Sequence, residues 1–309
     1  MIQLNGAFSK LLVLFGFCLL FGAIFSLAGL ALIKPLFGLE FSDVAAVMSD
    51  LSSRNSIQVL KFLQLLNSIG LFLLPALLFS LLFIAQPKKE LRLDQPISLW
   101  QIGFIFILYL SLIPLINLMV SINGELNLPE SLEALEYWMR DAEDRAKALT
   151  EAFLQMEGNG DLWVNVMLMG LLPAVGEELI FRGIMQRTIQ KSTRNHHIGI
   201  WVAAFFFSAL HFQFYGFLPR MVLGAFFGYL LVWTNSLWAP ILAHFINNTM
   251  ALLIAYYYGS ESLETEIDSL GSTTDTLWIS GISLVVFSYF IYRFRQLSHK
   301  TGKVDMVRD

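Results

Sequence analysis

Long apolar stretches alternate with short polar ones along the chain, and the lengths of the apolar stretches decide its class. Eight of them have about 20 predominantly apolar residues, which is what an α-helix needs to cross the ~30 Å hydrocarbon core of a bilayer. They lie at 11–33, 62–85, 99–121, 162–187, 198–214, 218–234, 237–258 and 277–294. The pattern predicts an all-α, polytopic integral membrane protein with about eight transmembrane helices.

The polar connection 128–161 has a different pattern, which predicts one extramembrane amphipathic helix. Its apolar residues recur at spacings of three and four, and three pairs of opposite charge stand four residues apart on the polar side. The apolar seam is Leu132, Leu135, Met139, Ala142, Ala146, Leu149 and Phe153, and the pairs are Glu136/Arg140, Asp141/Arg145 and Glu143/Lys147. We interpret this helix as resting on the membrane or on the bundle, with a substrate-binding role as the alternative.

Composition supports the membrane class, and the charge distribution gives an orientation. The chain is 56% hydrophobic and 14% charged, whereas soluble domains have about 25% charged residues. Twelve Lys and Arg residues lie on the side of the two termini, and six lie on the other side. Because positive residues in short loops stay inside, we predict a cytoplasmic (inner) membrane protein with both termini in the cytoplasm. We expect no nucleic-acid partner, and the oligomeric state stays open.

Charged residues interrupt the stretch 162–187, and they direct attention to chemistry. Glu177 and Glu178 are adjacent and Arg182 follows. An ionised carboxylate at bilayer depth is costly unless it is paired or hydrated, so such residues are functional candidates. On a helix Glu178 and Arg182 are i,i+4 neighbours, whereas Glu177 points about 100° away and is left without that partner. A purely structural pair explains Glu178 and Arg182 but not Glu177.

Two further polar patterns follow in the next apolar stretches. Phe207 and His211 share one helix face, and so do His244 and Asn248. Taken alone, His211 could be a buried core histidine, and His244 with Asn248 could bridge helices. The only cysteine is Cys18, so disulfides and cysteine metal sites within one chain are excluded.

The three patterns together, Glu-Glu-x-x-x-Arg, Phe-x-x-x-His and His-x-x-x-Asn, resemble the CPBP family, also called Abi or CAAX-protease-like, of intramembrane proteases. The resemblance covers about residues 162–258, and the first half of the chain carries none of these motifs. It divides the chain into four parts. These are N-terminal transmembrane helices 1–127, the amphipathic helix 128–161, a CPBP-like catalytic core 162–258, and 259–309 with an acidic loop, the last transmembrane helix and a cytoplasmic tail.

The resemblance implies an intramembrane endopeptidase that cleaves membrane-associated protein or peptide substrates. Glu177 would be the general base that activates water, with His211 helping to hold it. His244 and Asn248 would stabilise the oxyanion. Glu178, Arg182 and Phe207 would support the site, and the Glu178–Arg182 pair would fix the helix and tune Glu177.

Two alternatives remain at the level of the sequence. Glu177, His211 and His244 could instead hold zinc with a fourth position open for water, although the usual pair of histidines four residues apart on one helix is absent. We therefore favour a site without a metal or other cofactor. The protein could also be a non-proteolytic scaffold or bacteriocin self-immunity factor, or a proton-coupled transporter, but no inverted repeat supports transport.

Overall fold

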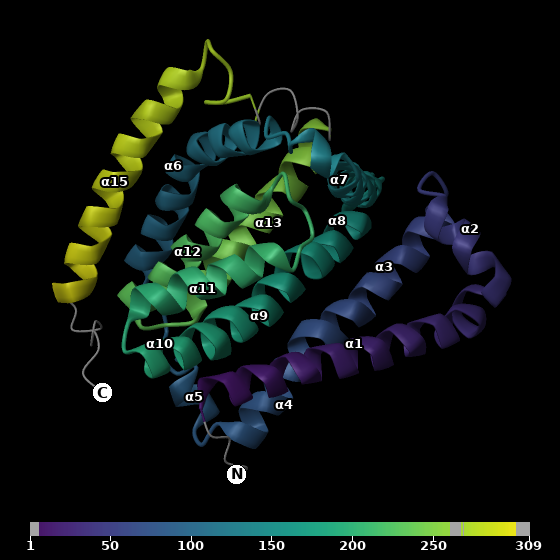
Figure 1. Ribbon diagram of the computed structural model, residues 1–309, viewed down its shortest axis with the longest axis horizontal. Coiled ribbons are helices and arrows are strands. Elements are labelled where there is room, and N and C mark those ends of the chain that lie inside the picture. The colour runs from purple at the N-terminus through teal and green to yellow at the C-terminus, as the bar shows by residue number, and fades with distance from the viewer. Residues whose placement is uncertain (1–5, 260–266, 268, 301–309) are drawn as a thin grey trace.

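Helices make up the architecture of the protein in a computed structural model, which describes residues 6–259, 267 and 269–300. Within those ranges there are no strands, and short turns join the helices (Figure 1). Parts of the predicted acidic loop and of the predicted C-terminal tail fall outside the described residues. The all-α prediction is confirmed.

Seven helical segments of the described chain are long and apolar enough to cross a membrane. They are α1 (Ala7–Phe37), Arg54–Phe83, α6 (Leu99–Gly124), Asn159–Thr193, α12 (Phe217–Thr234), α13 (Trp238–Tyr258) and Leu277–Ser298 of α15 (Leu277–Lys300). They match seven of the eight predicted spans, so the protein is a polytopic membrane protein.

The prediction of a full span at 198–214 is wrong. This segment forms α11 (His196–Ala209), whose 14 residues extend only ~21 Å. The chain then turns through residues 210–216, with Phe212 in the left-handed region at φ 54°. Since that turn is rich in aromatic residues, its hydropathy is close to that of the helices on either side, and the sequence pattern does not reveal the break.

Both composite helices contain π-helical stretches next to a proline. Arg54–Phe83 comprises α3 (Arg54–Ser68), the π stretch Ile69–Leu73 and α4 (Leu74–Phe83), which has Pro75 in its first turn. Asn159–Thr193 comprises α8 (Asn159–Asn165), α9 (Leu172–Glu178), α10 (Arg187–Thr193) and the π stretches Val166–Leu171 and Leu179–Gln186. Pro173 lies in the first turn of α9. Proline has no N–H for the helical ladder, and a wider turn before it accommodates the missing bond.

The central helices α9 to α13 lie between two outer groups (Figure 1). On one side α1 and α4 pack on the central helices through an apolar cluster that includes Leu14, Phe79 and Phe207. On the other side α6, α12, α13 and α15 share a second cluster that includes Leu108 and Phe227. The polar side chains of the central helices are therefore enclosed by apolar layers.

Two glycines of α12 allow close contact with its neighbours. A Cβ atom at Gly224 would lie 3.1 Å from both Arg182 Nη2 and Phe207 Cδ1. A Cβ atom at Gly228 would lie 2.7 Å from Gln186 Oε1. This small-xxx-small motif thus serves packing within the chain, where a short helix–helix distance exposes backbone carbonyls to side chains of the facing helix.

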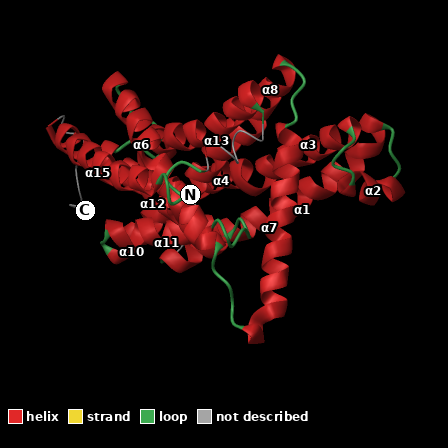
Figure 2. Ribbon diagram, turned by 90° about the horizontal axis from the view of Figure 1, so that it is seen from above, coloured by secondary structure: helices red, strands yellow, loops and turns green. Residues whose placement is uncertain are grey.

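The predicted amphipathic helix is present as α7 (Glu133–Leu154). Figure 1 shows it end-on and Figure 2 shows it running across the bundle. Glu136 pairs with Arg140, and Asp141 with Arg145, as predicted. Because α7 lies across the ends of the spans, it is placed to cover one face of the bundle.

Cysteine labelling in intact cells would test the predicted orientation. After replacement of Cys18, we expect an Arg145→Cys reporter on α7 to react with an impermeant maleimide. A reporter placed after Arg295 should react only once the membrane is permeabilised, because the positive-inside rule places it in the cytoplasm. An Arg145→Cys reporter that is shielded in intact cells would contradict this orientation.

Candidate active site

The helix Asn159–Thr193 brings four polar side chains into the apolar centre of the molecule. Glu178, Arg182 and Gln186 have no exposed surface, and Glu177 is 8% exposed. Glu178, Arg182 and Gln186 are four residues apart, so they follow one face of the helix. Such burial requires that each charge find a partner, because an unpaired charge in this environment is strongly destabilising.

Arg182 finds partners on two helices. Its Nη1 donates to Glu178 Oε1 at 2.8 Å, which is the predicted i,i+4 pair, and its Nη2 donates to the Gly224 carbonyl at 2.9 Å. The guanidinium carbon lies 4.5 Å from the centre of the Phe207 ring and 5.5 Å from that of Phe227. The aromatic faces favour the cation without providing further hydrogen bonds.

Glu178 also holds a histidine from α13. Its Oε1 atom accepts from His244 Nδ1 at 2.9 Å, so one carboxylate joins His244 to Arg182. The imidazole stacks on Phe227, with centroids 5.2 Å apart, and meets Phe207 edge-on at 5.7 Å. Because a carboxylate accepts, Nδ1 carries hydrogen and Nε2 is the nitrogen that faces the remaining carboxylate.

That remaining carboxylate is Glu177. Its Oε2 atom lies 4.0 Å from His244 Nε2 and has no hydrogen-bond partner among the described residues. The separation is too long for a direct hydrogen bond, and one water molecule between the two atoms can bond to both. The prediction that Glu178 is paired and Glu177 is not agrees with this geometry.

His211 lies just beyond the last residue of α11, at an exposed position. Its Nδ1 donates to the Phe207 carbonyl at 2.6 Å, which leaves Nε2 free to accept. Its ring centroid is 5.0 Å from that of Phe207, whose ring also contacts His244. No hydrogen bond joins His211 directly to Glu177 in the part of the chain that the structure describes.

The predicted helix borders placed His211 too far from Glu177 along the membrane normal, and the observed borders remove that difficulty. The first helix continues to Thr193 rather than ending near 187, and α11 begins at His196. Glu177 is therefore 16 residues before one side of this turn, and His211 is 15 residues after the other side. In antiparallel helices both residues then lie ~23 Å from the turn.

Asn248, one turn after His244, bonds to the helix that carries Glu177. Its Nδ2 atom donates to the Met169 carbonyl at 3.0 Å. Met169 precedes Pro173 by four residues, so its carbonyl is the one that proline leaves without a donor in an α-helix. One amide hydrogen of Asn248 is thus used in joining helices, and the second remains for a ligand.

Sequence reasoning missed Arg220, which lies near the same site. Its guanidinium donates to the side chain and the carbonyl of Gln213, at 2.8 and 3.3 Å, and lies within electrostatic range of Glu177 and Glu143. Glu143, on α7, accepts from Tyr215 N at 3.3 Å. Burial under this turn raises the pKa of the Glu143 carboxyl.

The helix α7 holds the turn that follows His211. Its Trp138 ring packs on Phe214 with centroids 5.3 Å apart, and its Arg140 guanidinium lies 4.5 Å from the centre of the Tyr215 ring. Asn123 of α6 adds a hydrogen bond to the Phe214 carbonyl at 2.9 Å. The amphipathic periodicity predicts the helix, but no local signal in the sequence links it to this turn.

The residues of the alternative zinc set do not fit a metal ion. Glu177 and His244 face each other, whereas His211 is on the far side of the Phe207 ring. Across the described chain, no group of three or more His, Cys, Asp or Glu side chains is placed to share an ion. A zinc site needs three protein ligands within about 2.2 Å of one point, so we derive no step through a metal.

Buried Glu, Arg and His side chains in the centre of a polytopic bundle define a membrane protein with an enclosed polar site. Residues 159–250 match the family model described as type II CAAX prenyl endopeptidase Rce1-like. This chain carries an Rce1-like (CPBP) family domain, as the resemblance predicts. All the predicted site residues lie within the matched segment.

A curated protein also resembles this segment. The uncharacterized protein YpbD of Bacillus subtilis (strain 168) is 34% identical over 86 residues, which are 26% of this chain and 41% of the relative. The similarity thus spans less than half the length of either protein. No solved structure matches the chain.

Proposed function

We propose that this protein is an intramembrane endopeptidase that hydrolyses peptide bonds of membrane-associated proteins or peptides. The observation that carries the proposal is the gap between Glu177 Oε2 and His244 Nε2. It is 4.0 Å wide, and Glu177 Oε2 has no hydrogen-bond partner among the described residues. A water molecule held there would be in contact with a carboxylate that can take its proton.

The reaction follows from the groups around that water. Glu177 takes one proton as the water oxygen forms a bond to the scissile carbonyl carbon. Glu177 then returns the proton to the amide nitrogen as the C–N bond breaks, which gives a carboxylic acid and an amine. His211, whose Nε2 is free, would help to hold the water from the exposed side.

The developing oxyanion needs donors, and His244 and Asn248 are the candidates. A cationic His244 donates from Nε2 while its Nδ1–H remains on Glu178, and Glu178 is in turn neutralised by Arg182. Asn248 has one amide hydrogen left after its bond to Met169. Donors fixed in advance in a water-poor site contribute most to such stabilisation.

Hydrolysis by the purified protein in H₂¹⁸O tests the proposal. Peptides from membrane proteins should gain one ¹⁸O at each new C-terminus, and the label should be absent with Glu177→Ala. Activity should survive rigorous chelation, because the described residues form no zinc set. Loss on chelation with recovery on added zinc would show the metal-dependent alternative. The absence of any labelled product would favour a non-proteolytic role.

A further inference from the structure

A second cavity, with a volume of ≈ 280 Å³, opens on a different face of the helix that carries Glu177. It lies between the first residues of α1, the end of α4, the helix α5 (Pro87–Glu90) and α10. The proposed hydrolysis does not use it. Its volume approaches the lower end of the range for small-ligand sites, about 300 Å³.

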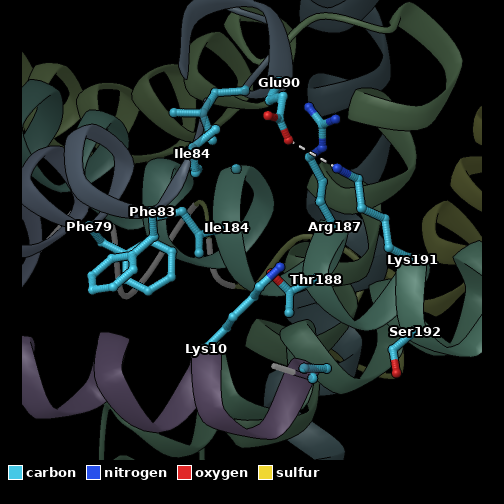
Figure 3. A pocket seen from close by; sticks show the side chains of 14 residues that line it. Lys10, Phe79, Phe83, Ile84, Glu90, Ile184, Arg187, Thr188, Lys191 and Ser192 are labelled. Atoms are coloured by element: carbon cyan, nitrogen blue, oxygen red, sulfur yellow. Dashed lines mark hydrogen bonds and ion pairs between the residues drawn. The ribbon is translucent and has the colours of Figure 1, made fainter. Parts of the chain in front are cut away.

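Three cations face this cavity, and they outnumber its acidic residues. Lys10 comes from α1, and Arg187 and Lys191 come from α10 (Figure 3). Glu90 is the one carboxylate among the residues that line it, and it pairs with Lys191 at 3.0 Å. The lining therefore carries an excess of two positive charges.

Two of these cations have no partner. Neither Lys10 nor Arg187 forms a side-chain hydrogen bond or ion pair with a described residue, and Arg187 Nη1 is buried. A buried guanidinium nitrogen without an acceptor is costly. Solvated surface lysines carry no such cost, so Arg187 distinguishes this cavity from an ordinary cationic surface.

The opposite wall of the cavity is apolar. Phe79, Phe83 and Ile184 face the cations across the opening, and Phe79 is only 2% exposed (Figure 3). A ligand that fits both walls has an anionic group beside carbon atoms. The cavity lies where several spans begin or end, which is the depth of lipid headgroups.

We propose that this cavity binds a phosphate group, carried either by an anionic phospholipid or by a free phosphate compound. Arg187 and Lys10 would contact the phosphate oxygens, since a guanidinium offers paired donors and an ammonium a compact charge. The hydroxyl of Thr188, which also lines the cavity, is a further donor. The apolar wall would contact the adjoining carbon atoms.

Native mass spectrometry of the full chain in neutral detergent tests this site with lipid probes. We expect wild type to retain phosphatidylglycerol in preference to zwitterionic phosphatidylcholine. Arg187→Gln should lower that retention about fivefold, because one Lys or Arg near the surface contributes roughly that factor. Glu90→Gln should raise it, because it removes the lining carboxylate and frees Lys191.

Lys89→Gln is the matched control, since Lys89 is exposed on the same short helix as Glu90 but does not line the cavity. A parallel arm measures the shift in melting temperature with inorganic phosphate and glycerol phosphate. Selective lipid retention identifies a lipid as the source, and a phosphate shift without lipid retention identifies a free compound. Equal effects of Arg187→Gln and Lys89→Gln in both arms, or weaker binding by Glu90→Gln, would overturn the proposal.

Folding is controlled within the same experiment. Arg187→Gln removes an unpartnered buried charge, so we expect its melting temperature without ligand to equal or exceed that of wild type. The two lining variants are expected to change binding in opposite directions, which general unfolding cannot produce.

Discussion

Glu177→Gln should leave a folded, membrane-inserted protein whose hydrolysis is reduced by a factor of at least about 10²–10⁴. The amide has the size of the carboxylate but cannot accept a proton from water. Because Glu177 Oε2 has no hydrogen-bond partner among the described residues, the substitution breaks no protein contact that is observed at this atom. The initial rate of peptide hydrolysis, together with the melting temperature in detergent, would measure both consequences.

The exposed carboxylate of Glu133 provides a matched control for this experiment. Glu133→Gln makes the same chemical change on α7, away from the site, and should keep the wild-type rate. Near-normal hydrolysis by Glu177→Gln would rule out Glu177 as the base. A lowered melting temperature in Glu177→Gln alone would instead indicate a structural role for this carboxylate.

Arg182→Ala should have the largest effect on stability, on the order of 3–5 kcal/mol, because it removes one side of a buried ion pair. Glu178 would keep only His244 as a partner, and the Gly224 carbonyl would lose its side-chain donor. Thermal unfolding in detergent and the yield of inserted protein would report the loss. Hydrolysis should fall as well, since Glu178 would no longer fix His244.

Two comparisons separate pairing from simple loss of a side chain. Arg145 forms the same i,i+4 pair with Asp141 on exposed α7, where Arg145→Ala should cost less than about 1 kcal/mol. The double variant Glu178→Leu/Arg182→Met removes both charges and should recover stability but not activity. If Arg182→Ala proved as stable as Arg145→Ala, the assigned role of the buried pair would be wrong.

Length and periodicity predict most of this fold, because the bilayer imposes a minimum span and the helix imposes its repeat. The exception is α11, where the aromatic residues of the turn 210–216 extend the apolar run past the end of the helix. Phe212 adopts the left-handed conformation there, which is uncommon for a bulky residue, so composition does not reveal the turn.

The site divides in the same way between local and tertiary information. The Glu178–Arg182 pair follows from i,i+4 spacing, and the effect of Pro173 on the Met169 carbonyl follows from the chemistry of proline. The bonds of Glu178 to His244 and of Met169 to Asn248 join residues more than 60 positions apart. No local pattern encodes such distances. A hint was available for Gln186, which continues the four-residue spacing of Glu178 and Arg182.

The uneven burial of the spans bears on how the protein is made. In the most apolar 18-residue window of Asn159–Thr193, 61% of the residues are buried inside the protein, against 11% for α1. Glu177, Glu178 and Arg182 would each disfavour insertion of the isolated helix by about 2.5–3.5 kcal/mol. We therefore expect α1 to enter the bilayer unaided, and the helix with the site to leave the translocon only as α11, α12 and α13 become available to cover its charges.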